Sequence, residues 1–410
     1  MNELLARIFR AESGQVLSSL MYVCQDLQMA EDALQDAFVQ ANIQWPKEGV
    51  PENKGAWLHT VAKRKLIDKL RQSTSQKNQH KLQLIEQHFS IQSQQVAESD
   101  YDVPDERLRL IFTCCHPALN AEAQVALTLR TLCGINVKEI ARAYLTSEVA
   151  MGQRITRAKK KIKDAGIAYS VPTKEQLANR LPSVLKVIYL IYNESYNAYE
   201  SQTLTKADLA QEAIRLSLLM VELLPNSEVL GLAALLLFHD SRRSSRQSAQ
   251  ESYIPLEKQN RKLWDQTIIQ RADHYLCAAL DYQQPGPYQI QAAISSLHAN
   301  AQNWHATDWR QIHLLYSSLY RLNPSAIVAL NCAVSLAYYG DINKAYKNII
   351  ELEDTLKHYQ PYYAAKAELE VKLAQYALAI NSLNNAIKLS KNNSERDYLQ
   401  RRLNTLKHKV

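Results

Sequence analysis

The residues with the most obvious chemical potential are Cys114, Cys115 and His116, which follow one another in the segment FTCCHPAL. Thiolates and imidazoles bind zinc, and a cysteine beside a base can act as a nucleophile. Three adjacent side chains point in divergent directions, however, and cannot readily close one tetrahedral site. The chain has no cysteine pair spaced CxxC and no HExxH motif. We therefore expect these residues to pack in a core, and we predict no metal site, no cofactor and no enzymatic activity.

A different chemistry is suggested by charge, which alternates in blocks although the net charge of the chain is only +7. Eight bases and one acid lie between Lys54 and Lys81, and six bases and no acid lie between Arg154 and Lys163. The acidic blocks are 26–36, with four acids, and 98–106, with five. Two basic stripes separated by acidic stretches predict two contacts with a polyanion. The alternative is that each stripe only solvates an exposed helix face.

The scarcity of glycine limits which functional loops the chain can build. Of 410 residues, 9 are Gly and 12 are Pro, and no two glycines lie closer than Gly49 and Gly55. The motifs GxGxxG, GxxxxGK and GxSxG each need two glycines within five positions, so a dinucleotide-binding loop, a P-loop and a nucleophile elbow are excluded. Abundant Ala, Leu, Gln, Lys and Glu, with few helix breakers, predict an all-α fold.

Helical periodicity defines the elements that must position these charges. Residues 2–45 read as two or three helices. A loop is expected from Trp45 to Gly55, which holds two prolines and two glycines. A basic helix follows over 56–71, and then a linker rich in Gln and Ser over 72–100. Further helices are predicted over 105–115, 121–133, 136–145 and 148–164.

The segment 121–164 has the proportions of a helix-turn-helix, the motif that places its second helix in the major groove of DNA. Ser147 can cap this second helix. Gln153, Arg154 and Arg157 are spaced for base edges or the adjacent backbone. Four lysines come next along the chain, and their charge favours contacts with DNA phosphates: Lys159, Lys160, Lys161 and Lys163. The alternative is an ordinary three-helix bundle with a basic surface helix.

The order of these motifs resembles bacterial sigma factors of the extracytoplasmic-function type, which are initiation subunits of RNA polymerase. AEDALQDAF, over 30–38, is similar to region 2.2 of that family, which binds the coiled-coil clamp of the largest polymerase subunit. The resemblance implies that core polymerase is contacted by Asp32, Gln35, Asp36 and Phe38. Such a contact explains an acidic block that DNA binding alone does not.

The basic helix over 56–71, AWLHTVAKRKLIDKLR, is similar to regions 2.3 and 2.4, which open and read the minus 10 promoter element. The resemblance makes the loop 46–55 the segment that captures a flipped base, and basic and aromatic side chains suit an opened strand. The implied minus 10 contacts are Trp57, His59, Lys63, Arg64 and Arg71.

The helix-turn-helix is similar to region 4, which reads the minus 35 element as duplex DNA. The implied minus 35 contacts are Ser147, Glu148, Met151, Gln153, Arg154, Arg157 and Lys160. Gly152 lies inside this reading helix, where glycine lowers helix stability by about 1 kcal/mol. It would allow close approach of the backbone to DNA. The resemblance also implies a contact with the polymerase flap.

The C-terminal part of the chain shows an internal repeat. Ala345, Ile349 and Leu352 recur 34 positions later as Ala379, Leu383 and Ala386, and 34 is the period of a tetratricopeptide unit. Sigma factors in which RLRLIFTCCHPAL introduces region 4 carry a long extension that resembles such repeats. We therefore expect a helical solenoid, with a concave surface for a peptide, a domain or a small ligand.

These features give four predicted segments: region 2 over 1–72, a linker over 73–105, region 4 over 106–167 and a repeat-like regulatory domain over 168–410. The expected partners are core polymerase and promoter DNA, with docking of the C-terminal domain on the rest of the chain. No membrane contact is expected, because the longest apolar run is 10 residues, and the protein should be cytoplasmic. The alternative function is a helix-turn-helix activator with a sensing domain, which is not a polymerase subunit.

Overall fold

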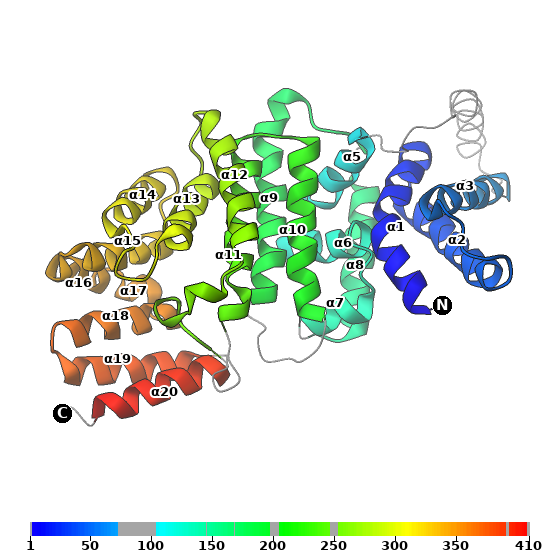
Figure 1. Cartoon of the computed structure of the whole chain (residues 1–410). Coiled ribbons are helices and arrows are strands. Elements are labelled where there is room, and N and C mark those ends of the chain that lie inside the picture. Colours follow the sequence, from blue (N-terminus) through cyan, green and yellow to red (C-terminus); the bar gives the residue numbers. More distant parts are fainter. Residues whose placement is uncertain are drawn as a thin grey trace. The chain divides into compact units, whose positions relative to one another are not determined.

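The computed structural model describes residues 2–72, 104–144, 146–167, 169–196, 205–246, 253–390 and 393–407. The predicted linker 73–105 therefore lies almost wholly outside the described residues. Every regular element in the described ranges is a helix, which confirms the predicted all-α fold. The chain divides into two compact units, Met1–Glu194 and Ser195–Val410 (Figure 1).

Unit 1 begins with three helices that share one core. α1 packs against both α2 and α3, and the side chains of Leu20, Cys24, Leu58 and Leu66 are fully buried. Asp26 caps α2, because its carboxylate accepts hydrogen bonds from the first free amides of that helix. These helices are α1 (Asn2–Cys24), α2 (Leu27–Glu48) and α3 (Lys54–Gln72).

The connection between α2 and α3 is shorter than the loop predicted over 45–55. α2 continues through Pro46 and ends at Glu48, where Gly49 takes a φ of 91°. Proline is tolerated here because it lies in the last turn and is exposed, so water can reach the carbonyl group that it leaves unbonded. The buried ring of Trp45 packs edge-on against Trp57, with the ring centroids 5.2 Å apart, and joins the two helices.

The second half of unit 1 contains the predicted helix-turn-helix. α8 spans the residues predicted for it, and the Ser147 hydroxyl accepts a hydrogen bond from the amide of Ala150, which confirms the predicted cap. Met151, Ile155, Ala158 and Ile162 recur at spacings of three and four and form its buried side. The four helices are α5 (Pro104–Cys114), α6 (Ala121–Thr131), α7 (Val137–Ala143) and α8 (Glu148–Asp164).

The helix that follows, α9 (Lys174–Tyr196), is tied to α5 and α6. The Arg180 guanidinium donates to the Phe112 carbonyl oxygen at 2.8 Å, and the Ser183 hydroxyl donates to that of Cys115 at 3.0 Å. Gln124 on α6 donates to both Ser183 and the Cys115 carbonyl. Unit 1 accordingly extends to Glu194, beyond the boundary predicted after residue 167.

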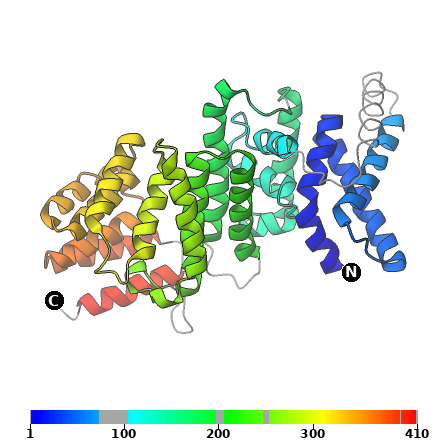
Figure 2. The ribbon, with the colours of Figure 1, turned by 45° about the horizontal axis from the view of Figure 1, so that its top comes forward.

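Unit 2 consists of consecutive helices that lie side by side (Figure 2). α11 is buried on all sides, as its apolar run from Val229 to Phe238 requires. The α-helices are α10 (Thr205–Leu223), α11 (Ser227–Ser241), α12 (Gln266–Asp281), α13 (Pro287–Asn300), α14 (Trp309–Leu322), α15 (Ala326–Tyr339), α16 (Ile342–Ile350), α17 (Glu353–Leu356), α18 (Gln360–Lys372), α19 (Tyr376–Leu389) and α20 (Asn393–Lys407). The described residues between α11 and α12 include the 3-10 turns η1 (Arg243–Ser245), η2 (Leu256–Lys258) and η3 (Arg261–Leu263). In the described part of the chain no helix is both long and apolar enough to cross a membrane.

The predicted 34-residue repeat falls on α16 and α19. Ala345 and Ile349 of α16 are fully buried, as are Ala379 and Leu383 of α19. Each of these helices packs against the one before it in a pair, α15 with α16 and α18 with α19. The matching burial agrees with the periodicity, whereas a tetratricopeptide architecture stays a prediction.

Candidate functional site

The acidic segment of α2 presents one exposed side. Asp32, Gln35 and Asp36 lie at spacings of three and four, so they share this side of the helix. Asp36 also forms an ion pair with Lys69 of α3 at 2.9 Å. Phe38 lies apart from this group and packs edge-on against Phe9, with the ring centroids 4.8 Å apart. Three of the four predicted polymerase contacts are thus brought together, and the fourth takes part in packing.

Two apolar residues on the same side of α2 were not predicted. Val39 is 59% exposed and Ile43 is 51% exposed, and they follow Asp32 at seven and eleven positions. Large apolar side chains that are exposed next to charged ones are typical of a protein-binding surface. Helical spacing alone could have found them, since both positions lie in phase with Asp32.

The predicted minus 10 residues divide between two sides of α3. Trp57, Arg64 and Arg71 are spaced seven apart and form one stripe, on which Trp57 is half-buried and both arginines are exposed. Lys63 lies at the edge of this stripe and is half-buried, and burial lowers its pKa. This stripe combines two cations with an aromatic ring.

His59 differs from these residues because it lies inside unit 1. Its Nε2 atom is 2.7 Å from the Ser19 hydroxyl oxygen of α1, and the side chain is buried. Burial, and to a lesser extent the charge of Lys63, lowers the pKa of His59 to about 4. The imidazole is therefore neutral at physiological pH, and among the predicted minus 10 residues His59 is the one that is buried.

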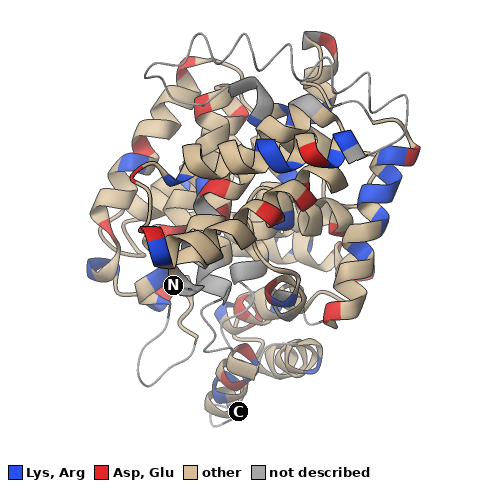
Figure 3. Ribbon diagram, turned by 90° about the vertical axis from the view of Figure 1, so that its right-hand side faces the viewer, with Lys and Arg blue, Asp and Glu red and all other residues tan. Residues whose placement is uncertain are grey.

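The predicted reading helix α8 carries an exposed stripe opposite its buried side. Gln153, Arg154 and Arg157 are on this stripe, and Lys160, Lys161 and Arg157 border a shallow surface hollow. Figure 3 shows lysines and arginines following one helix along much of its length. Ser147 and Glu148 are exposed at the start of α8. Six of the seven predicted minus 35 residues therefore lie on accessible surface.

Met151, the seventh, is buried and packs in the core behind α8. Arg154 forms an ion pair of 2.9 Å with Glu122 of α6, which orients its guanidinium. A larger side chain fits at Gly152, because the nearest atom to an added Cβ would be a Val137 side-chain atom 3.9 Å away. Neither the burial of Met151 nor the partner of Arg154 was predicted from the spacing along α8.

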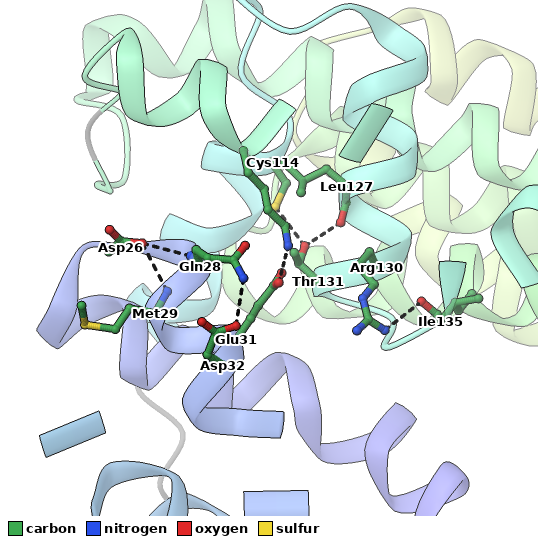
Figure 4. Close-up of polar contacts among 11 residues, drawn as sticks. Asp26, Gln28, Met29, Glu31, Asp32, Cys114, Leu127, Arg130, Thr131 and Ile135 are labelled. Atoms are coloured by element: carbon green, nitrogen blue, oxygen red, sulfur yellow. Dashed lines mark hydrogen bonds and ion pairs between the residues drawn. The ribbon is translucent and has the colours of Figure 1, made fainter. Parts of the chain in front are cut away.

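Two lysines of α8 lie on another flank and contact α2. Lys159 forms an ion pair with Glu31, and Lys163 forms one of 3.2 Å with Asp26. Figure 4 shows Glu31 of α2 pointing toward Thr131 and Cys114, with Asp26 at the start of the same helix. Sequence reasoning assigned these lysines to DNA phosphates, because local spacing contains no information on contacts between distant segments.

Cys114 and Cys115 lie in the core between α5 and α6. The Cys114 sulfur is 3.1 Å from the Thr131 hydroxyl oxygen, and that of Cys115 is 3.6 Å from the Thr128 hydroxyl oxygen. Burial raises the pKa of both thiols, that of Cys115 to about 12. A reactive cysteine needs a lowered pKa. This environment agrees with the predicted packing role.

His239 and Asp240, near the end of α11, make polar contacts inside unit 2. Asp240 pairs with Arg243 and accepts a hydrogen bond from Gln211, while the ring of His239 lies beside the Ser295 hydroxyl. Burial lowers the pKa of His239 well below its usual value. These contacts join helices α10, α11 and α13.

Three segments of the chain match models of known protein families. Residues 8–76 match the family model for sigma-70 region 2, and residues 109–162 match that for sigma-70 region 4. Residues 180–280 match a family of unknown function, DUF6596. The first two matches cover the α2 and α3 stripes and the helix-turn-helix, and the third begins within α9.

An uncharacterized protein of Rhizobium meliloti (strain 1021) is 39% identical over 394 residues, which are 96% of this chain and 93% of that protein. No solved structure matches the chain. The similarity therefore runs through both sigma regions and the C-terminal extension together. Sigma factors recruit RNA polymerase to promoters and are not themselves enzymes. With regions 2 and 4 in order and an extension after them, the chain belongs to the sigma-70 family of RNA polymerase sigma factors.

Proposed function

We propose that this sigma factor is of the extracytoplasmic-function type and binds core polymerase through the exposed side of α2. Asp32, Gln35 and Asp36 would meet the clamp of the largest subunit, with Val39 and Ile43 as an apolar component. The exposure of both apolar side chains beside acids supports this assignment. Phe38 would act indirectly, by packing against Phe9 and fixing the position of α2.

Promoter DNA would be bound at two elements. An opened minus 10 strand would be bound by Trp57, Lys63, Arg64 and Arg71. Aromatic rings stack on nucleobases, and lysine and arginine side chains neutralise phosphates. His59 would support this surface from within, through its contact with Ser19.

The minus 35 duplex would be read by α8. Gln153 and Arg154 have the side chains that suit base edges, whereas Arg157 and Lys160 border the hollow where a phosphate can be neutralised. Ser147 and Glu148 would contact the groove at the start of the helix, and Met151 would hold α8 in place. The stripe opposite the buried side is the single observation that best supports this proposal.

The C-terminal extension would set the activity of the sigma regions, by docking on them or on polymerase. Its first helix, α9, is bonded to α5 and α6 through Arg180 and Ser183, which gives the extension a direct attachment to region 4. The protein would act in the cytoplasm and associate with the nucleoid when bound to polymerase.

A binding experiment with purified core polymerase tests the α2 assignment. Asp32→Ala and Val39→Asp should each weaken association of the full chain with core polymerase, by about tenfold or more. Val149→Asp, at an exposed apolar position on α8, is the matched control and should leave polymerase association unchanged. Binding of the chain to intact duplex without any affinity for core polymerase would instead favour the helix-turn-helix activator.

A further inference from the structure

We propose that the pair Lys159–Glu31 is a latch that holds regions 2 and 4 together in the free protein. The latch must open before both promoter elements can be bound at once. This inference rests on the proposed function, because it assigns the two promoter elements to α3 and α8. It concerns a contact between α2 and α8 that neither DNA-reading stripe requires.

The ion pair lies in a contact between the two regions from which water is largely excluded. Only 16% of the Lys159 side chain and 10% of the Glu31 side chain are exposed. Phe9, Ser13 and Arg130 line the same crevice as Glu31. A charge pair this far from solvent is weakly screened, and removal of one partner leaves the other without compensation.

Close backbone packing accompanies the pair. A Cβ atom added to Gly14 of α1 would lie 2.8 Å from the Leu132 carbonyl oxygen at the end of α6. One added to Gly134 would lie 2.6 Å from the Ser13 hydroxyl oxygen. The Tyr169 hydroxyl, beyond α8, donates to the Ser18 carbonyl at 2.9 Å. Region 2 therefore also contacts region 4, and the residue Tyr169 just after it, through close packing and a hydrogen bond in addition to the two ion pairs.

The latch leaves the proposed binding surfaces uncovered. Lys159 and Lys163 lie on a different flank of α8 from Gln153, Arg154 and Arg157. On α2, Val39 and Ile43 are exposed, and Gln35 is exposed at the edge of the crevice that holds Glu31. The closed form is therefore compatible with binding to the polymerase clamp or to one DNA element. It constrains the distance between the two DNA-binding surfaces.

That distance is incompatible with a promoter. A compact unit of the size of Met1–Glu194 has a radius of gyration of about 16 Å, and so is roughly 40 Å across. Elements centred 10 and 35 base pairs upstream are about 85 Å apart along straight duplex DNA. Region 4 must therefore separate from region 2 when both elements are bound, with the segment between α3 and α5 as the connection.

The geometry of Glu31 makes the latch reversible. One carboxylate oxygen accepts from Lys159, whereas the other is buried without a hydrogen-bond partner among the described residues. When the latch opens, this oxygen can be hydrated by water. The free energy of that hydration offsets part of the free energy that is lost with the ion pair. The second pair is weak, because 75% of the Lys163 side chain is exposed.

The test measures the separation of the two regions in the full chain. Spin labels are placed on cysteines introduced at the exposed positions Glu52 and Lys138, after Cys277 and Cys332 have been replaced by serine. Pulsed electron spin resonance then gives the distribution of distances. We expect one short distance in the parent chain, and at least a tenfold larger long-distance fraction in both Glu31→Gln and Lys159→Met.

Two further variants separate the latch from nonspecific effects. The double variant should open no more than either single variant, because both remove the same pair. Gly14→Ala should open the contact without any change of charge, while alanine favours the α1 helix itself. Lys160→Met removes a neighbouring lysine of α8 that faces the other way, and should leave the distances unchanged.

Run-off transcription with core polymerase, on genomic fragments bound by the reconstituted holoenzyme, provides the functional readout. The latch variants should reach half-maximal transcription at a several-fold lower concentration of the chain. Unchanged distances in Glu31→Gln, Lys159→Met and Gly14→Ala would overturn the latch even if the chain directs transcription. Opened variants with unaltered transcription would overturn its role in promoter binding. A chain that never directs transcription would instead refute the proposed function.

Discussion

Arg154 of α8 and Glu122 of α6 form an ion pair of 2.9 Å, although 69% of the Glu122 side chain remains exposed. An exposed pair of this kind contributes at most about 1 kcal/mol to stability. Its consequence is geometric, because it holds the guanidinium against Glu122 of the neighbouring helix α6. If Arg154 reads a base as proposed, the negative charge of Glu122 beside it would disfavour contacts with DNA phosphates.

The first prediction concerns Arg154. Arg154→Ala should weaken binding of the reconstituted holoenzyme to the minus 35 duplex by about tenfold to a hundredfold, since one good base contact is worth roughly 1–3 kcal/mol. Fluorescence anisotropy with a labelled duplex measures the change. Association with core polymerase serves as the control and should be unchanged. Equal losses toward DNA and polymerase would contradict this division of function.

A second prediction concerns Gly152, whose substitution separates folding from DNA binding. Alanine fits the open space at this position and should raise the free energy of unfolding of unit 1 by about 1 kcal/mol. If DNA approaches the backbone there, the same methyl group should weaken minus 35 binding. Chemical denaturation and duplex binding on one preparation provide both values. A gain in stability with unchanged affinity would show that Gly152 has no contact role.

The third prediction applies the same substitution to Gly231, with the opposite expected sign. A Cβ atom at this position of α11 would lie 2.6 Å from the backbone nitrogen of Gln289 on α13. Both helices would have to separate, so Gly231→Ala should lower the free energy of unfolding of unit 2 by roughly 1–3 kcal/mol. Hydrogen exchange over residues 205–390 would report the loss. Unchanged exchange protection would contradict this close packing.

The fourth prediction is a pH dependence caused by His59. Its pKa is about 4 in the folded protein and near 6.5 when unfolded, so the unfolded state binds more protons between these values. The contribution of His59 to the free energy of unfolding is fully present above pH 6.5. It is lost as the pH falls toward 4, which lowers the free energy of unfolding by on the order of 3 kcal/mol. Hydrogen exchange over residues 8–72 measures it locally.

His59→Gln provides the control for this pH dependence. Glutamine can still bond Ser19 but does not titrate, so the acid sensitivity of α1 to α3 should diminish. His298 in unit 2 also has a pKa lowered by burial, to about 3, and should titrate independently of the substitution. An unaltered pH profile over residues 8–72 would assign the acid sensitivity to other groups.

Local sequence rules accounted for most of the helices. The cap at Ser147 placed the start of α8 at the correct residue, because capping acts over a few positions. Pro46 was misread as part of a loop, since its effect depends on where the helix ends. The helical spacing of α2 could have predicted that Val39 and Ile43 lie on the same side as Asp32.

Contacts between distant segments could not be obtained in this way. The pairing of Lys159 with Glu31 joins positions 128 residues apart, and nothing in the local pattern around either residue distinguishes it from a solvated charge. The attachment of α9 through Arg180 likewise depends on a carbonyl group of α5. Such contacts arise from tertiary packing, which single-sequence periodicity does not contain.

Run-off transcription with purified core polymerase and genomic DNA fragments is the most direct test of the central claim. Addition of the full chain should produce transcripts whose 5′ ends depend on it and whose upstream sequences share two elements at one spacing. Asp32→Ala, measured under the same conditions, should greatly reduce them. The absence of any chain-dependent transcript, in a preparation that binds intact duplex on its own, would contradict the account and favour an activator that is not a polymerase subunit.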